Sequence, residues 1–289
     1  MTGTVNTVLG PVPSADLGVV AVHERLVSVV PGAQFAYDVR IDRAEVFEAV
    51  AAQLRAFRAA GGGTVVDSTG MFHGRDVRLL EALSRATGVH LVASTGMGPE
   101  AMLGGYFLTP QTNPPTPWPA DRFADLFTAE VTEGMVVPRV ERRGLAGLAV
   151  TATTRGGRTA TDESLLLGVA RTALTTGVPA SLRSDDVDDL DVVLKEGLPA
   201  HRVAVVADDP LAVVERGAYA VLTDPARVLE LVDAGHAERV LLTTGGVGVS
   251  FGEDAPTASY ADLTTALPRD VATQVLVANP RDLLAIEKR

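Results

Sequence analysis

The chain contains no cysteine, few aromatic residues and no long apolar run. Without Cys, its 289 residues cannot form disulfides, thiolate nucleophiles or cysteine-ligated metal sites. Aromatic residues make up only 4% of the sequence, so a core must be built mainly from Val, Leu and Ala. No apolar run approaches the roughly 18 residues of a membrane-spanning helix, and Met1 to Pro13 lacks the pattern of a signal peptide. We therefore expect a cytoplasmic protein with no membrane partner.

Positive charge is also in short supply. Lys and Arg number 25 against 36 Asp and Glu, which gives a formal net charge of −11. A chain of this balance is not expected to bind nucleic acid or an anionic membrane surface through its bulk charge. A local basic pocket remains compatible with it. The hydrophobic content of 46% is enough for a sizeable core.

Short Val- and Leu-rich runs alternate with longer amphipathic segments along the chain. The predicted strands are 18–24, 64–69, 90–95, 147–153, 179–184, 203–208, 218–224 and 239–245. The predicted helices are 43–60, 76–87, 119–134, 161–176, 186–196, 210–216 and 225–234. This order predicts an α/β protein, a (β/α)8 TIM barrel that forms one domain over residues 1–289. A doubly wound open sheet is the alternative, although no Gly-rich phosphate-binding motif follows the first strand.

The end of the first predicted strand looks like a metal-binding pair that lacks its second ligand. A His-x-His pattern at a strand end puts both imidazoles on one side, because side chains alternate with period 2. Here the sequence is His23-Glu24-Arg25. A guanidinium is permanently charged and has no lone pair to offer a cation.

Several segments in order resemble the phosphotriesterase family of the amidohydrolase superfamily. They are 7–13, 17–18, 23–24, 62–69, 74–76, 87–89, 94–96, 143–148, 217–219 and 279–280. The resemblance covers nearly the whole chain and implies the barrel fold. Because members of that family are often dimers, it also implies a homodimer.

The resemblance further implies a site for two divalent metals, which this sequence does not reproduce. The family's ligands are two His on strand 1, a carboxylated Lys on strand 4, one His each on strands 5 and 6, and an Asp on strand 8. The corresponding positions here hold His23, Arg25, Val150, Arg183, Ala207 and either Thr244 or Gly245. We therefore predict no metal ligands and no cofactor.

Two of the replacements are arginines, which suggests a different kind of pocket. Arg25 and Arg183 are expected to project into the space of the metals and to bind a carboxylate or phosphate. The alternative is that each pairs with an acidic residue and merely fills the cavity; the candidates are Asp67, Asp185, Asp186 and Asp208. The hydroxyls of Thr95, Thr151 and Thr244 could bind a polar ligand, although Thr is also ordinary strand material.

His23 is the candidate general acid or base, because its pKa is easily tuned near neutrality. Asp67 and Asp208 are the candidate catalytic carboxylates. The alternatives are a relic histidine and an Asp67 that ties loops together. His73 is expected to be exposed in a mobile loop, and the glycines at 245, 246, 248 and 252 predict another mobile loop after the last strand.

Three hypotheses of function follow. The first is a metal-independent enzyme that acts on a small anionic substrate by acid/base chemistry, as a lyase, cyclisation or hydrolysis step in biosynthesis. The second is a binding protein that kept the fold and lost the chemistry. The third is a metal-dependent hydrolase with an altered ligand set.

Overall fold

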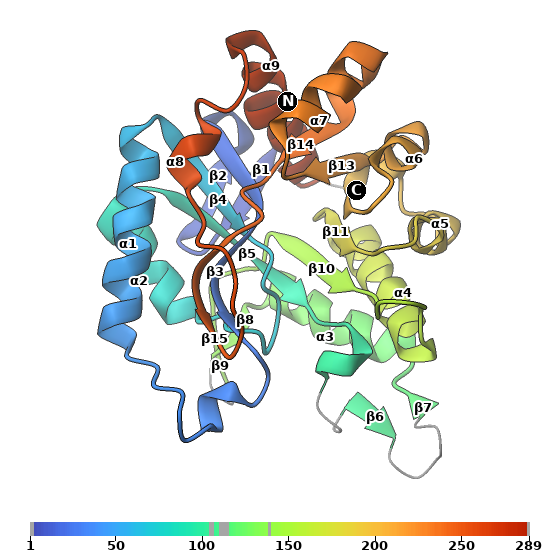
Figure 1. Cartoon of the computed structure of the whole chain (residues 1–289). Coiled ribbons are helices and arrows are strands. Elements are labelled where there is room, and N and C mark those ends of the chain that lie inside the picture. Colours follow the sequence, from blue (N-terminus) through green and yellow to red (C-terminus); the bar gives the residue numbers. More distant parts are fainter. Residues whose placement is uncertain (1–2, 104–106, 110–115, 138–139, 288–289) are drawn as a thin grey trace.

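The computed structural model describes residues 3–103, 107–109, 116–137 and 140–287. Its centre is one curved sheet of parallel strands with helices packed around it (Figure 1). In spatial order the strands are β14 (Val240–Leu242), β13 (Tyr219–Leu222), β12 (Val203–Val206), β11 (Ala180–Arg183), β10 (Leu148–Ala152), β5 (His90–Gly96), β4 (Gly62–Asp67), β3 (Val19–Val29) and β15 (Val247–Phe251). Each of the eight predicted strands overlaps one of these, and the chain order matches the spatial order from β3 to β14.

The ninth strand, β15, is where the sequence prediction was wrong. The glycines after β14 predicted a mobile loop, but residues 247–251 pair in parallel with the far half of β3, from Val247 opposite Arg25 to Phe251 opposite Val29. The reason is that β3 continues five residues past its predicted end and offers free backbone groups. Gly248 permits this pairing by close approach, because a Cβ there would lie 2.4 Å from the carbonyl oxygen of Leu26.

The helices form the outer layer. They are α1 (Arg43–Ala59), α2 (Val77–Thr87), α3 (Ala120–Thr132), α4 (Ala160–Thr176), α5 (Asp188–Lys195), α6 (Pro210–Glu215), α7 (Pro225–Leu231), α8 (Tyr260–Leu263), α9 (Arg269–Thr273) and α10 (Asn279–Leu284). The predicted start of α1 at Arg43 is confirmed. The side chain of Asp42 caps the helix by accepting hydrogen bonds from the backbone N–H groups of Ala44 and Glu45. Among these helices, none combines the length and the hydropathy needed to cross a bilayer.

Three pairs of short antiparallel strands lie outside the main sheet among the described residues, and the sequence analysis did not predict them. They are β1 (Thr4–Thr7) with β2 (Gly10–Pro13), β6 (Leu108–Thr109) with β7 (Thr116–Pro117), and β8 (Met135–Val137) with β9 (Glu141–Arg143).

Two apolar clusters fill the fold. The larger one lies between the sheet and the helices, and the smaller one contains Val20, Val22, Val66, Val92, Leu148, Val150, Val221 and Leu241 on the inner face of the strands. Leu283 and Leu284 of α10 belong to the inner cluster as well. Aliphatic side chains dominate the interior, in line with the low aromatic content.

A contact between distant strands shows how strongly the sheet curves. β3 and β11 are separated by β4, β5 and β10, so in a flat sheet they would lie roughly 19 Å apart. In the structure, Nδ1 of His23 on β3 lies 2.8 Å from the hydroxyl oxygen of Ser181 on β11. The inner face is therefore concave. The last strand of the series, β14, also meets β3, because Thr243 directly after β14 hydrogen-bonds to Glu24.

Candidate functional site

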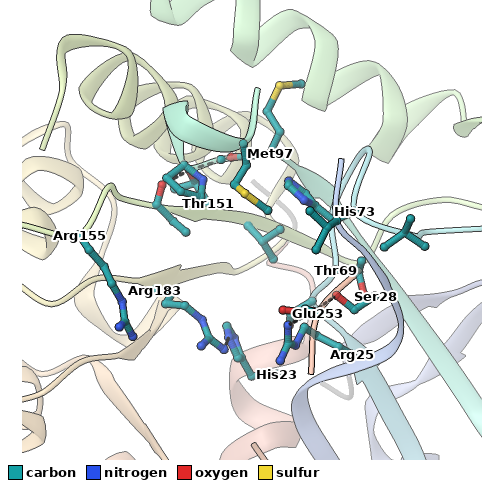
Figure 2. Close-up of a pocket in the computed structure, with 18 residues that line it drawn as sticks. His23, Arg25, Ser28, Thr69, His73, Met97, Thr151, Arg155, Arg183 and Glu253 are labelled. Atoms are coloured by element: carbon teal, nitrogen blue, oxygen red, sulfur yellow. Dashed lines mark hydrogen bonds and ion pairs between the residues drawn. The ribbon is translucent and has the colours of Figure 1, made fainter. Parts of the chain in front are cut away.

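A cavity of about 410 Å³ opens at the carboxyl ends of the strands (Figure 2). Its lining comes from β3, β10 and β11 and from the loops that follow β4, β5, β10 and β15. In the view of Figure 2, Arg155, Arg183, His23 and Arg25 lie along one side, and His73, Met97 and Thr151 lie along the other. This is the end of a parallel α/β fold at which active sites are built.

An irregularity in β3 brings its polar side chains into the cavity. Val20 and Val22 both belong to the inner apolar cluster, yet His23 and Arg25 both line the cavity. The alternation changes phase because His23 adopts a left-handed backbone with φ of 55°, and the pairing with β4 shifts between Ala21 and Glu24. Such bulges re-aim side chains next to functional sites. The predicted same-side placement of His23 and Arg25 is thereby confirmed.

The imidazole of His23 is held between two residues of β11. Its Nε2 lies 3.2 Å from Nη2 of Arg183, and its Nδ1 lies 2.8 Å from Oγ of Ser181. A guanidinium can only donate, so Nε2 must accept and the ring proton belongs on Nδ1. Burial, together with the charges of Arg183 and Arg25, lowers the pKa of His23 from 6.5 to about 3. His23 is therefore neutral at physiological pH, and the lone pair of its Nε2 already accepts a hydrogen bond from Arg183.

Arg25 has an acidic partner that the sequence analysis missed. Its Nη1 lies 3.2 Å from Oε1 of Glu253, and the hydroxyl of Ser28 donates to the same oxygen at 2.6 Å. None of the four aspartates considered from sequence pairs with Arg25 among the described residues. Glu253 follows β15, so its position depends on a strand that the sequence analysis did not predict.

Arg183 is different, because no carboxylate of the described residues lies within 4.0 Å of its guanidinium. Arg155, a third arginine on the cavity, lies 3.9 Å from Asp185. Burial and the charges of Arg25 and Arg155 lower the pKa of Arg183 below its usual value. Three arginines therefore face one carboxylate, Glu253, around the cavity of a chain whose net charge is −11.

His73 and Ser68 are cavity residues that the sequence analysis did not select. His73 was expected in a mobile, exposed loop, but its carbonyl oxygen accepts a 2.8 Å hydrogen bond from the backbone N–H of Val29 and its ring lines the cavity. Its Nε2 and the hydroxyl of Ser68 are buried and have no hydrogen-bond partner among the described residues. Burial lowers the pKa of His73. Both residues line the cavity, although these two polar atoms themselves are buried.

The predicted catalytic carboxylates do not join His23 in the cavity. Asp67 is buried, and its side chain accepts a 2.8 Å hydrogen bond from the backbone N–H of Thr69, within the loop after β4. Burial raises its pKa. Asp208 lies in a neighbouring hollow of about 120 Å³. The structure therefore places His23, Asp67 and Asp208 in three separate surroundings.

The three predicted threonines also differ in position. Thr151 lines the cavity and donates a 2.9 Å hydrogen bond to the carbonyl oxygen of Met97. Thr95 is fully buried and does not line the cavity. Thr244 lies outside the cavity, and both its hydroxyl and its backbone N–H donate to Glu24. Thr151 is the one placed to meet a ligand.

Glu24, the residue between His23 and Arg25, is a buried connector of strands. Its Oε1 accepts hydrogen bonds from the hydroxyl of Thr243 at 3.0 Å and from the N–H of Thr244 at 2.8 Å. Burial is the main reason that its pKa rises from 4.5 to about 7, against the lowering effect of the threonines. Glu24 thus holds β3 against the end of β14.

The residues at the implied metal positions do not fit a metal pair. The ligand nitrogen of His23 faces a guanidinium, Arg25 pairs with Glu253, and Val150 stands on the cavity wall where a lysine would be needed. Within the described part of the chain, no three His, Asp or Glu side chains are grouped to hold a metal ion.

The comparisons with known proteins agree with one another. The profile of the phosphotriesterase family matches residues 3–207. The phosphotriesterase homology protein of Mycobacterium tuberculosis is 28% identical over 233 residues, which cover 80% of this chain and 68% of that protein. The aryldialkylphosphatase of Saccharolobus solfataricus is 31% identical over 124 residues, which cover 43% of this chain and 37% of that protein.

A solved structure shares the fold over almost the full length. It comes from the molecular engineering of organophosphate hydrolysis activity from a weak promiscuous lactonase template. The TM-score is 0.80, with 21% identity, and the match covers 98% of this chain and 100% of the other.

Proposed function

Because this chain belongs to the phosphotriesterase family, we propose that it uses the family's closed (β/α)8 barrel to bind a small carboxylate or phosphate and to act on it without a metal. The single observation that carries this proposal is the position of Arg183. Its guanidinium lies on Nε2 of His23 and has no carboxylate within 4.0 Å among the described residues.

The charge around the cavity supports an anionic ligand. Arg183 is exposed at the cavity, so its guanidinium can exchange water for the anionic group of a ligand. Glu253 supplies one for Arg25, and Asp185 lies near Arg155, which leaves Arg183 to a ligand. Guanidinium groups bind carboxylates and phosphates through paired hydrogen bonds. The site is thus suited to a ligand with one such group.

The chemistry of the donors supports metal independence. A metal on His23 would need the lone pair that Arg183 occupies, and the cation would lie against a fixed positive charge. Arg25 offers no lone pair. The fixed charges of the arginines take over the role of binding anionic groups.

For the reaction, His73 is the best-placed proton carrier. Its ring lines the cavity, its imidazole is neutral near pH 7 because burial lowers its pKa, and its buried Nε2 has no hydrogen-bond partner among the described residues. A neutral imidazole can accept a proton from a bound substrate while Arg183 stabilises the negative charge that develops. This is the proton transfer expected of a lyase, a cyclisation or a hydrolysis step.

A non-catalytic binding protein is the second candidate. It is favoured by the fact that neither ring nitrogen of His73 makes a hydrogen bond among the described residues, so nothing orients the imidazole as in most acid/base sites. His73→Gln separates the two functions. It abolishes turnover if His73 carries protons, and it leaves ligand binding within about threefold in either case.

Binding of inorganic phosphate and of small carboxylates, measured by calorimetry on the purified chain together with its metal content, tests the proposal. We expect no stoichiometric metal, binding that resists chelation, and about a tenfold or larger loss of affinity in Arg183→Ala. Arg227→Ala is the matched control, because that exposed arginine pairs with Glu230 and lines no part of the cavity. A stoichiometric metal whose removal abolishes binding would overturn the proposal, as would full affinity in Arg183→Ala.

A further inference from the structure

A second hollow adjoins the main cavity and shares two of its arginines. This side pocket, of about 120 Å³, is lined by Thr153, Arg155, Arg183, Ser184, Asp185, Val206, Ala207 and Asp208. Arg155 and Arg183 also line the main cavity of about 410 Å³. A ligand whose anionic group lies on these two arginines therefore has two spaces into which its remaining atoms can extend.

The two spaces differ in charge. Around the main cavity three arginines face Glu253 alone, and Met97, Met102 and Val150 add apolar surface. In the side pocket the two arginines are balanced by two carboxylates, Asp185 and Asp208. An anion bound on these two arginines would leave both carboxylates without a counter-charge, which a cationic group of the same ligand would supply.

Asp208 is the carboxylate of the side pocket that has no partner among the described residues. Asp185 lies 3.9 Å from Arg155, whereas Asp208 is solvent-exposed, lines the side pocket and makes no ion pair within 4.0 Å among the described residues. It also accepts no hydrogen bond there, unlike its neighbour Asp209, which caps α6. Its carboxylate is therefore free to receive a donor from a ligand.

We infer that the ligand is a zwitterion, with an anionic group on Arg183 and Arg155, an ammonium group in the side pocket on Asp208, and an apolar portion in the main cavity. The inference rests on the proposed function, because it needs the anion site. An ammonium group is small enough for a pocket of about 120 Å³, whose volume equals that of roughly four water molecules. The substrate class is thus an amino carboxylate or an amino phosphate.

Matched pairs of probes test this inference. Calorimetry compares phosphoethanolamine with ethyl phosphate, and leucine, 3-aminobutyrate and 4-aminobutyrate with the same acids lacking the amine. We expect an amine to improve affinity about fivefold in one or more pairs, which corresponds to about 1 kcal/mol and lies at the upper end for an exposed ammonium–carboxylate contact.

Asp208→Asn identifies the source of the preference. We expect it to reduce the preference for the amine to about twofold or less and, at the same time, to tighten binding of the amine-free partner, because a nearby negative charge that repels the anion is removed. Asp233→Asn is the control, because that exposed aspartate lines neither hollow and makes no ion pair among the described residues. A variant that merely fails to fold would weaken both members of each pair and leave their ratio undefined, so circular dichroism accompanies each titration.

The outcomes separate this inference from the proposed function. Carboxylates and phosphates that bind through Arg183 with no gain from an amine in any pair would overturn the zwitterion and leave the anion site standing. An amine preference that persists in Asp208→Asn would overturn the role of the side pocket. If none of the probes binds and Arg183→Ala changes nothing, the anion site itself is wrong.

Discussion

Arg183 donates a hydrogen bond to Nε2 of His23 across the concave face of the sheet, over 3.2 Å. The two residues lie 160 positions apart and come from strands that would not touch in a flat sheet. The contact fixes the tautomer of His23 and explains in one feature why its lone pair is unavailable to a metal.

Removal of the guanidinium in Arg183→Ala should raise the pKa of His23 from about 3. Arg183 is the second cause of the lowered pKa after burial, so the value should move toward 6.5 without reaching it. The pH dependence of the imidazole proton shifts in NMR spectra measures it. Arg155→Ala removes another cavity arginine that does not contact His23 and should leave the pKa nearly unchanged. Equal titration of His23 in both variants would contradict the assignment.

Arg25 and Glu253 should affect anion binding in opposite directions. In Arg25→Ala the affinity for inorganic phosphate should fall about tenfold, because a charged hydrogen-bond donor is lost. In Glu253→Gln the affinity should rise, because Arg25 loses the carboxylate that now occupies it at 3.2 Å. Calorimetry on both variants at low salt checks the signs. A loss of affinity in both would mean that the Arg25–Glu253 pair positions the loop after β15 and does not compete with a ligand.

The buried carboxyl of Glu24 should make the fold less stable as pH rises. Its pKa is about 7 in the folded chain and 4.5 ordinarily, so the folded state holds the proton more tightly and the free energy of unfolding falls between pH 4.5 and 7. The difference amounts to about 3 kcal/mol. Glu24→Gln should remove this dependence while keeping an oxygen for Thr243 and Thr244. Urea unfolding of both proteins from pH 5 to pH 8 gives the comparison; parallel curves would show that Glu24 does not titrate in this window.

His23 should give the opposite dependence. Its folded pKa of about 3 lies below its ordinary 6.5, so its contribution to stability is complete above pH 6.5 and is lost as pH falls toward 3. His23→Asn removes the titrating group and keeps a residue that tolerates a left-handed backbone. Relative to this variant, the native chain should lose stability on acidification in urea unfolding. Between pH 4.5 and 6.5 the effects of His23 and Glu24 oppose each other, so only the single variants reveal them; a pH-independent difference would refute the buried, neutral imidazole.

Much of the frame could be predicted from sequence because the signals are local. The eight apolar runs marked strands buried on both faces, and Asp42 marked the start of α1. The alternation at the end of the first strand placed His23 and Arg25 on one side. The arginine at position 183 suggested a positively charged cavity before its geometry was known.

Other features of the site depend on distant parts of the chain. Glu253 reaches Arg25 only because β15 pairs with the extended end of β3, and the glycines of that segment predict a mobile loop instead. His73 lines the cavity because its loop bonds to Val29. Asp67 looked catalytic by its position after a strand, but its side chain is buried within its own loop.

The sequence by itself determined the strand and helix order and the aliphatic core, because these follow from periodicity and side-chain chemistry. Its resemblance to the family implied that the usual metal ligands are replaced. The tertiary structure alone decided which groups meet. Curvature of the sheet brings β11 to β3, so Arg183 can donate a hydrogen bond to Nε2 of His23. The same curvature lets Glu24 connect β3 to the end of β14, and the folded loops place His73 on the same cavity as Arg183 and Asp208 on the side pocket. A contact between residues 160 positions apart depends on how the whole sheet curves, which no local sequence pattern encodes.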